Sequence, residues 1–201
     1  MKKLQSTLPN MLAVLTLISV VASGALAYVN ELTKGPIQEN NAKVLAEGIN
    51  KVLCAENAEV ERVDSIGDAV VYVTDQGVAV ESIDAKAFGG TIKVLVGFAD
   101  DGSIKGYTVL AHAETPGLGA KAGEWFQQTG KGNIIGMKPG EKTLEVSKDG
   151  GEVDAITAST ITSRAFLRAV NAAYAAYADG PKTDVQSGAS RQNREPAPGE
   201  D

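Results

Sequence analysis

The fold is decided by Asp154-Ala155-Ile156-Thr157-Ala158-Ser159-Thr160-Ile161-Thr162-Ser163, a run of small and hydroxyl-bearing residues that leads directly into an amphipathic pattern. One apolar face recurs at three- and four-residue steps and predicts a helix ending near residue 179: Phe166, Ala169, Val170, Ala173, Tyr174 and Tyr177. A helix start needs one capping hydroxyl, yet four hydroxyl-bearing residues lie at the start of this helix: Thr157, Ser159, Thr160 and Thr162. The first helical turn also presents unpaired N–H groups and a partial positive charge, which suit a phosphate. From these residues alone, a capped polar loop and a phosphate site both stay open.

Length and composition indicate one globular domain with a core. The chain has 201 residues, of which 43% are hydrophobic, and a formal net charge of -6. This acidic balance argues against nucleic acid as a partner, because nucleic acid needs a basic surface. The only cysteine, Cys54, excludes an intrachain disulfide and is expected to be a buried small hydrophobe. Since His112 is the only histidine and no Cys/His cluster has metal-binding spacing, no metal site is predicted.

The N-terminal region carries a candidate membrane anchor. No charged residue occurs between Lys3 and Glu31, and residues 8–29 are almost wholly apolar, close to the ~20 residues that span a bilayer. Because Lys2 and Lys3 precede this stretch, the positive-inside rule predicts an N-terminus in the cytoplasm and a domain outside it. The alternative is a signal peptide cleaved near residues 25–27, but the apolar stretch is longer than signal peptides need. An uncleaved anchor is therefore favoured.

We expect four segments along the chain. These are a cytoplasmic N-terminus and transmembrane anchor over 1–29, a connecting helix over 30–60, a folded domain over 61–178 and a polar tail over 179–201. The connecting helix is expected to pack on the domain and to be interrupted at Gly35-Pro36. The tail holds scarcely an apolar residue and is expected to be disordered from Asp184 onward.

Within the domain, short strand patterns predict an antiparallel sheet packed by helices, which is an α+β fold. Residues 69–74 and 78–83 predict a hairpin. Residues 92–98 alternate apolar side chains on one face, and Asp100-Asp101-Gly102 turns the chain back into a strand over 103–111, a connection too short for a parallel crossover. We also expect an edge strand over 144–147 and a helix over 123–129. For Trp125 in that helix, packing in the core or at an interface is favoured over stacking on a ligand.

The strand over 103–111 leads into the loop His112-Ala113-Glu114-Thr115-Pro116-Gly117-Leu118-Gly119-Ala120-Lys121. Two glycines and a proline shape an exposed loop whose backbone can approach a ligand closely. On composition alone, an ordinary connection from a strand to a helix is the alternative.

Two of these stretches resemble FMN-binding domains. Residues 154–160, Asp-Ala-Ile-Thr-Ala-Ser-Thr, resemble the flavinylation motif of that family, and residues 114–119, Glu-Thr-Pro-Gly-Leu-Gly, resemble its loop beside the isoalloxazine ring. Two matches in the same order are more specific than either alone. The resemblance implies that a separate flavin transferase joins Thr160 to the phosphate of FMN by a phosphoester bond. It implies no catalytic residue in the mature protein.

The resemblance also implies the other cofactor-binding residues. They are Asp154, Thr157, Ala158 and Ser159 in the motif, and Thr115, Pro116, Gly117, Leu118, Gly119 and Lys121 in the loop. Thr115 and Leu118 would touch the flavin, and Lys121 would lie near phosphate or ring oxygens. The motif more usually has glycine and alanine where this chain has Ala158 and Ser159. Ala158 resists positive φ more than glycine does, and Ser159 offers a rival hydroxyl.

The layout of the chain, from the anchor to about Tyr177, resembles the G subunits of Rnf electron-transport complexes. The C subunit of the sodium-translocating NADH:quinone oxidoreductase is a close relative and stays an alternative, as does a non-redox interaction module outside the cytoplasm. The Rnf resemblance implies a redox subunit, without an independent catalytic centre, of a membrane complex that moves electrons between ferredoxin and NAD and exports sodium or protons. It implies three partners: the other subunits, the flavin transferase and membrane lipid. It places the protein in the inner (cytoplasmic) membrane, with its flavin domain on the periplasmic side.

Overall fold

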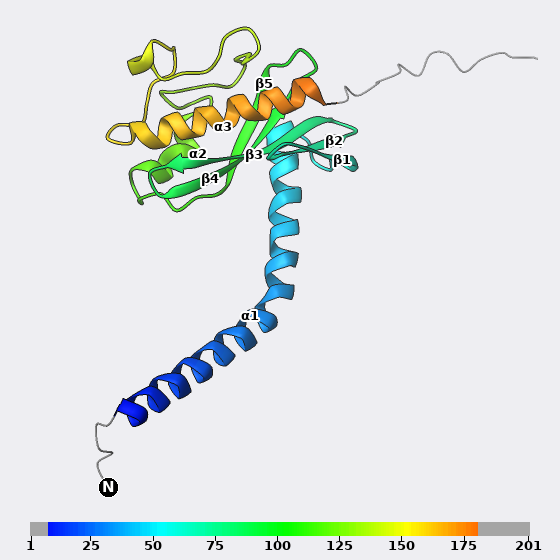
Figure 1. Cartoon of the computed structure of the whole chain (residues 1–201). Helices are drawn as coiled ribbons and strands as arrows, with labels where there is room; N and C mark the ends of the chain where they lie inside the picture. Colours follow the sequence, from blue (N-terminus) through cyan, green and yellow to red (C-terminus); the bar gives the residue numbers. More distant parts are fainter. Residues whose placement is uncertain (1–7, 181–201) are drawn as a thin grey trace, which may run out of the picture. The chain divides into compact units, whose positions relative to one another are not determined.

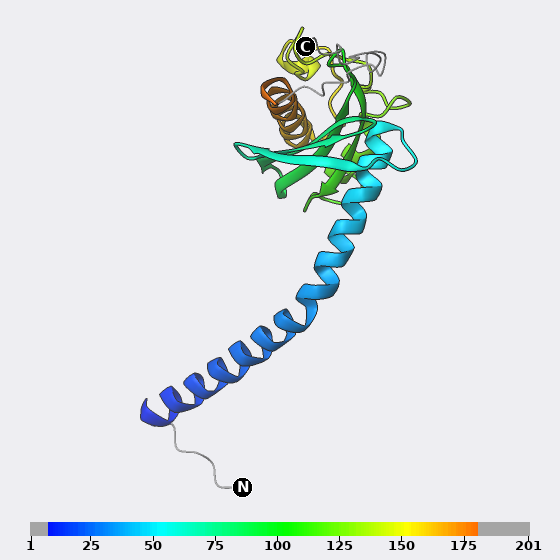
Figure 2. The same cartoon turned by 90° about the vertical axis from the view of Figure 1, so that its right-hand side faces the viewer.

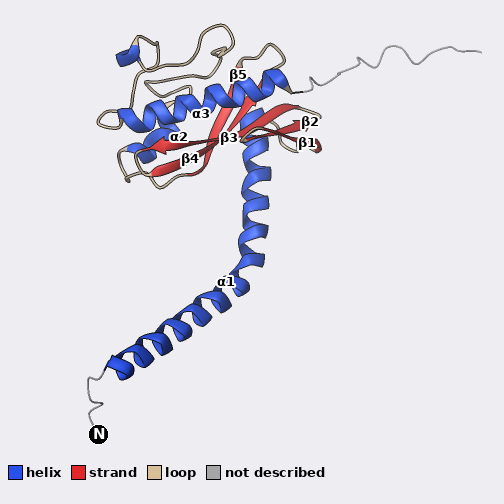
Figure 3. Ribbon diagram, in the orientation of Figure 1, coloured by secondary structure: helices blue, strands red, loops and turns tan. Residues whose placement is uncertain are grey.

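The computed structural model describes residues 8–180, so the tail expected to be disordered from residue 184 lies outside the described residues. Figures 1 and 3 show its helices and strands. In chain order these are α1 (Leu8–Leu53), β1 (Val60–Ile66), β2 (Ala69–Thr74), β3 (Gly77–Ala87), β4 (Gly90–Phe98), β5 (Ile104–Ala111), the 3₁₀ helix η1 (Gly119–Lys121), α2 (Ala122–Trp125), the 3₁₀ helix η2 (Ser147–Asp149) and α3 (Thr160–Asp179). The chain divides after Glu47 into two units, which are described separately.

The first unit consists of α1 up to Glu47. Among the described residues, α1 is the one helix long and apolar enough to cross a membrane, and its most apolar window has no buried residue. Such a helix near the N-terminus fits a single membrane anchor. The expected interruption at Gly35-Pro36 is wrong, because α1 continues through Pro36. A proline removes one intrahelical hydrogen bond, but the turns on both sides of it still form.

The second unit is built on a five-stranded antiparallel sheet with the strand order β1-β2-β3-β4-β5. The predicted hairpin is formed by β2 and β3, where Val71 pairs with Val80, and the predicted turn at 100–102 connects β4 to β5. The α+β class expected from the sequence is confirmed. β1 is an additional edge strand, whose mostly exposed side chains carry no alternating apolar signal. β3 also continues to Ala87, beyond the predicted end at residue 83.

Helix α3 lies across one face of the sheet and buries the predicted apolar stripe (Figures 1 and 2). The alternating residues of β4 belong to the same core cluster, and together the two rows comprise Ile92, Val94, Val96 and Phe98 from the strand and Phe166, Ala169, Val170 and Ala173 from the helix. Apolar side chains repeat every two residues in the strand and every 3.6 residues in the helix, so each element has one apolar face, and the two faces pack against each other. This packing fixes where α3 begins relative to the sheet.

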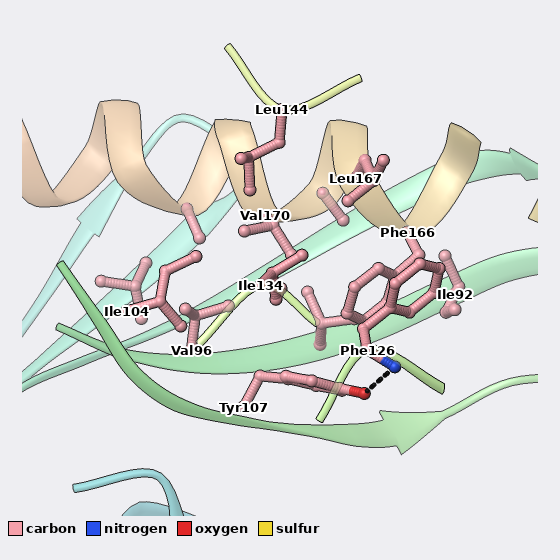
Figure 4. Packing of buried hydrophobic residues seen from close by; sticks show 14 of the residues in the cluster. Ile92, Val96, Ile104, Tyr107, Phe126, Ile134, Leu144, Phe166, Leu167 and Val170 are labelled. Carbon is pink, nitrogen blue, oxygen red and sulfur yellow. Dashed lines mark hydrogen bonds between the residues drawn. The ribbon is translucent and has the colours of Figure 1, made fainter. Parts of the chain in front are cut away.

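Tyr107 on β5 attaches α2 to this core (Figure 4). Its hydroxyl donates a 2.7 Å hydrogen bond to the Ala122 carbonyl and accepts one of 3.1 Å from the Phe126 N–H. Burial raises the pKa of Tyr107 well above its usual value. Phe126 in turn stacks on Phe166 of α3, with ring centroids 4.4 Å apart and planes 5° apart. α2 is therefore held between β5 and α3.

The other face of the sheet is partly covered by the last residues of α1. Val52 and Leu53 are buried there. The strands opposite them carry glycines because the helix backbone approaches closely: a Cβ at Gly97 would collide with the Val52 carbonyl, and one at Gly106 would come to 2.9 Å from the same oxygen. The end of α1 is thus part of the domain core.

Three local predictions are wrong for identifiable reasons. Cys54 is exposed instead of buried, because it follows the last helical residue in a left-handed conformation with φ +55°. The helix expected over 123–129 ends at Trp125, whose carbonyl accepts a 3.2 Å hydrogen bond from Gly132. Within the described residues no strand forms over 144–147. There, the backbone N–H and carbonyl of Leu144 bond instead to the side chain of Asn171, at 3.0 and 2.9 Å.

Candidate functional site

The start of α3 gives different roles to the hydroxyls that the sequence clusters. Thr162 is buried and donates a 2.6 Å hydrogen bond to Glu114 Oε2. The buried Ser163 hydroxyl accepts from the Ile156 N–H at 2.9 Å and donates to the Ser159 carbonyl at 3.0 Å. Ser159 is only 9% exposed, and its own side chain does not cap the helix. The hydroxyls of Thr162 and Ser163 are thus engaged inside the fold.

Thr160 differs from them in position and exposure. It is the first residue of α3, it is partly exposed, and its Oγ1 accepts a 3.3 Å hydrogen bond from Lys148 Nζ. Thr157 is also exposed, but it lies in the turn before the helix. Because Ser159 makes no capping bond, the first-turn N–H groups beside Thr160 lack the usual capping side chain. Among the motif hydroxyls, Thr160 alone combines exposure with a place on the first turn.

The backbone of the motif turns sharply at Ala158. This residue has φ +60°, in the left-handed region, and the turn is closed by a 3.0 Å hydrogen bond from the Ser159 N–H to the Ile156 carbonyl. The position where glycine is more usual therefore does require positive φ. An alanine in this conformation is strained by about 1–2 kcal/mol.

A pocket of about 350 Å³ opens beside the start of α3. It is lined by Phe88, Glu114, Thr115, Leu118, Gly119, Ala158, Ser159, Thr160, Ile161 and Thr162. The volume falls in the range of small-molecule sites, which is roughly 300–1,000 Å³. The two stretches picked out in the sequence, about forty residues apart, thus form the walls of one pocket.

Glu114 holds three segments of this pocket together. Its buried carboxyl accepts hydrogen bonds from the Gly89 N–H at 2.8 Å through Oε1 and from Thr162 through Oε2. Gly89 lies in the turn between β3 and β4, while Thr162 lies on α3. Gly119 has no room for a side chain, because a Cβ there would collide with Glu114 Oε2 and lie 2.8 Å from Thr162 Oγ1. Glu114 therefore sets the spacing of the loop, the turn and the helix.

The loop over 115–121 folds back on itself through its backbone. The Thr115 carbonyl accepts hydrogen bonds from Leu118 and Ala120, at 3.2 and 3.3 Å, and Gly117 adopts φ +76°. Of the residues expected in the site from this loop, three line the pocket, and Pro116, Gly117 and Lys121 do not. From the motif, Asp154 and Thr157 do not line it either. Asp154 is engaged elsewhere, since its carboxyl accepts from Ser147 at 3.2 Å and its carbonyl from the Trp125 indole at 2.8 Å.

Sequence reasoning missed the apolar side of the pocket. Phe88, Leu118 and Ile161 line it and are 70%, 41% and 51% exposed. Only Leu118 was expected there. Phe88 occupies the turn before Gly89, and an exposed aromatic residue in a glycine-containing turn is the signal that could have identified it. Large apolar side chains left open to solvent around a pocket suit a planar aromatic ligand.

The cation nearest Thr160 was also missed. Lys148 lies on η2, a segment held to α3 by its neighbour Asp149, which forms two 2.6 Å hydrogen bonds with Arg164. The Arg164 hydrogen bonds lower the pKa of the Asp149 carboxyl. The contact between Lys148 and Thr160 depends on the ion pair between Asp149 and Arg164, so the local sequence around residue 148 does not predict it.

The chain carries an FMN-binding domain: that family matches residues 88–175, which run from the pocket residue Phe88 into α3. Its relatives over most of its length include the following three proteins, each named as the G subunit of an ion-translocating oxidoreductase complex. The identity is 33% with that of Cereibacter sphaeroides (78% of each chain), 31% with that of Vibrio cholerae (80% of this chain and 85% of the relative) and 30% with that of Shewanella piezotolerans (79% and 84%). The chain belongs to the family of G subunits of ion-translocating oxidoreductase complexes, the Rnf complexes.

The residues present in the pocket fit FMN. The apolar side formed by Phe88, Leu118 and Ile161 suits the flavin ring, and the uncapped first turn of α3 suits the phosphate. Thr160 offers a hydroxyl at that turn, with a lysine ammonium beside it. The pocket therefore combines an apolar side with a polar helix start, which are the two surfaces that the ring and the phosphate of FMN require.

Proposed function

We propose that this chain is the covalently flavinylated electron-carrier subunit of an Rnf-type membrane complex, with FMN joined to Thr160. The observation that carries the proposal is the placement of Thr160: a partly exposed hydroxyl on the uncapped first turn of α3, at the edge of a pocket with an apolar side. Ser159, the rival hydroxyl, is buried. The complex is proposed to move electrons between ferredoxin and NAD and to couple this to sodium or proton translocation.

Bound FMN would supply reversible electron transfer, and the protein would hold and orient it. Thr160 Oγ1 would carry the phosphorus, so the cofactor would not be lost by dissociation outside the cytoplasm. Phe88, Leu118 and Ile161 would exclude water from the ring. The Glu114 hydrogen bonds would keep the loop at a constant distance from α3. No residue of the site is assigned a proton-transfer step.

The proposed membrane arrangement follows from α1. The apolar part of this helix serves as an uncleaved, single-pass anchor, with Lys2 and Lys3 on the cytoplasmic side. The FMN-binding domain is then on the periplasmic side of the inner membrane, where it meets the other subunits of the complex. The same placement requires a flavin transferase that acts outside the cytoplasm.

Intact mass spectrometry of full-length protein co-expressed with a flavin transferase tests the attachment. We expect the wild type to gain the mass of one FMN less water and to show a fluorescent band on a denaturing gel. Thr160→Ala should lose both signals, whereas Ser159→Ala and Thr157→Ala should keep them. Wild-type protein without the added mass would contradict the proposal and favour a non-redox module. Co-purification with iron–sulfur subunits distinguishes an Rnf-type complex from the related quinone oxidoreductase.

A further inference from the structure

We propose that Lys148 is a positioning residue for the phosphate at Thr160. Its ammonium group would donate hydrogen bonds to the oxygens around phosphorus while the phosphoester forms, and would remain as their counter-ion afterwards. The inference rests on the proposed flavinylation and goes beyond it, because Lys148 lies outside both sequence motifs. It assigns a role in cofactor attachment to a residue of η2.

The contact itself is specific. Lys148 Nζ lies 3.3 Å from Thr160 Oγ1, and this is the only hydrogen bond of the lysine side chain among the described residues. A lysine ammonium has three N–H donors. One donor reaches the oxygen that would be esterified, so the others are available to oxygens on an atom bonded to it. Lys148 is exposed, which leaves room for the incoming group.

The residues on both sides of Lys148 fix its backbone. Asp149 is paired with Arg164, one helical turn after Thr160, through two hydrogen bonds of 2.6 Å. Ser147 donates a 3.2 Å hydrogen bond to Asp154, at the other end of the motif. η2 is therefore tied to α3 and to the motif at once, while the charged end of Lys148 engages neither carboxylate in an ion pair.

The chemistry of attachment explains why a cation is useful here. Condensing an alcohol with a free phosphate is unfavourable in water, so the flavin donor must carry an activated phosphate, as a flavin dinucleotide does. The Thr160 Oγ–P bond forms as the P–O bond to the leaving nucleotide breaks, the hydroxyl proton passes to a base of the transferase, and no electrons are exchanged. Negative charge develops on the oxygens around phosphorus, where a fixed cation stabilises it. A protonated lysine has no lone pair, so Lys148 is a donor and not the base.

The product also needs a counter-ion. A phosphodiester between Thr160 and the flavin keeps one negative charge, in a chain whose formal net charge is already -6. The first-turn N–H groups of α3 offset part of that charge, and Lys148 is the cation whose ammonium group contacts Thr160. Arg164 is less available, because its Nε and Nη2 both donate hydrogen bonds to Asp149.

The test compares single-residue variants of the full-length protein in detergent, with purified transferase and a flavin dinucleotide donor. Lys148→Gln removes the charge, and Lys148→Arg keeps it. Lys142→Gln is the matched control, because Lys142 is an exposed lysine that pairs with Glu152 instead of Thr160. Initial loading rates are followed by intact mass. We expect Lys148→Gln to lower kcat about tenfold, less than for a buried oxyanion donor because the site is exposed. KM should be little changed, Lys148→Arg should recover most of the rate, and Lys142→Gln should match the wild type.

A second readout examines the loaded protein directly. After complete loading, the ³¹P resonance of the phosphodiester should shift in Lys148→Gln and stay unchanged in Lys142→Gln. Thermal unfolding of the unloaded variants should match the wild type, since an exposed side chain contributes little to stability. Equal kcat and equal ³¹P resonances for both glutamine variants would overturn the inference while leaving flavinylation intact. A change in KM alone would also overturn it, because Lys148 would then serve to bind the transferase. Failure of the wild type to load would instead contradict the proposed function.

Discussion

Thr162 on α3 donates a 2.6 Å hydrogen bond to Glu114 across 48 residues of sequence, and both residues are buried. The second oxygen of the same carboxyl accepts from Gly89 in the turn between β3 and β4. One side chain thus determines how the three segments that line the pocket are spaced.

Removing the donor from this pair should destabilise the domain. Thr162→Val leaves Glu114 Oε2 buried without its partner, so we expect the free energy of unfolding to fall by about 1–3 kcal/mol. The control is Thr157→Val, an exposed position where the change should stay below about 0.5 kcal/mol. Trp125 is the only tryptophan, so its fluorescence during thermal unfolding reports on this domain alone. Equal melting temperatures for the two variants would contradict the role given to Glu114.

Replacing the strained alanine of the motif should have the opposite effect. Ala158→Gly releases the strain of φ +60°, and we expect a gain of about 1 kcal/mol in unfolding free energy. The matched control is Ala172→Gly on the exposed side of α3, where loss of helix propensity should lower the free energy by about 1 kcal/mol. Chemical denaturation measures both. A loss of stability in Ala158→Gly would mean that the turn is not held in the left-handed region.

The close packing at Gly119 leads to a prediction about cofactor loading. Gly119→Ala places a methyl group against Glu114 Oε2 and Thr162 Oγ1, so either the hydrogen-bonded Glu114–Thr162 pair or the loop must shift. We expect a loss of about 1–3 kcal/mol in stability and a lower fraction of flavinylated protein. Gly123→Ala is the control, because a Cβ there meets nothing within 4 Å. Intact mass and melting curves measure the two effects, and normal loading of Gly119→Ala would show that the pocket tolerates a displaced loop.

The ion pair between β3 and α3 should make stability depend on pH. Asp84 forms hydrogen bonds of 2.8 and 2.9 Å with Arg168, on segments 84 residues apart. Burial by itself raises the pKa of Asp84, but the hydrogen bonds from the Arg168 side chain and the Lys86 backbone N–H outweigh it, so the pKa is lowered. A lowered pKa means that the pair stabilises the fold above the unfolded-state pKa of about 3.9 and loses this effect as pH falls through the folded value.

Asp84→Asn isolates this contribution. At pH 7 we expect the variant to be less stable than the wild type by about 0.5–1 kcal/mol, and the difference should shrink below about pH 4. Urea denaturation across that pH range measures it. A difference that does not change with pH would show that packing, and not the charge of Asp84, is responsible.

The parts of the fold that were predictable are those in which one face is buried. The alternation over 92–98 and the helical spacing over 166–177 reflect the packing of β4 against α3, so the sequence reports it directly. β1 lacked any signal because its side chains are mostly exposed. Residues 144–147 have strand-like composition, but the backbone N–H and carbonyl of Leu144 bond to the Asn171 side chain instead of to a neighbouring strand. The local sequence does not indicate this, because Asn171 belongs to α3.

The candidate site shows the same limit. The motif and the loop could be read from the sequence because each is a continuous stretch that resembles an FMN-binding family. Phe88 and Lys148 could not, since one reaches the pocket through a hairpin turn and the other through an ion pair between Asp149 and Arg164. The resemblance to FMN-binding domains implied that Lys121 lies near the cofactor, whereas in the structure Lys148 is the lysine that contacts Thr160.

The burial of Val52 and Leu53 against Gly97 and Gly106 has a practical consequence for preparing the domain without its anchor. The sequence alone would place the domain boundary at residue 61. A truncated protein that begins there lacks the α1 residues that cover one side of β4 and β5, so Leu95 becomes exposed to solvent. A soluble fragment intended for crystallisation or spectroscopy has to begin no later than Gly48, so that the final turns of the helix are retained.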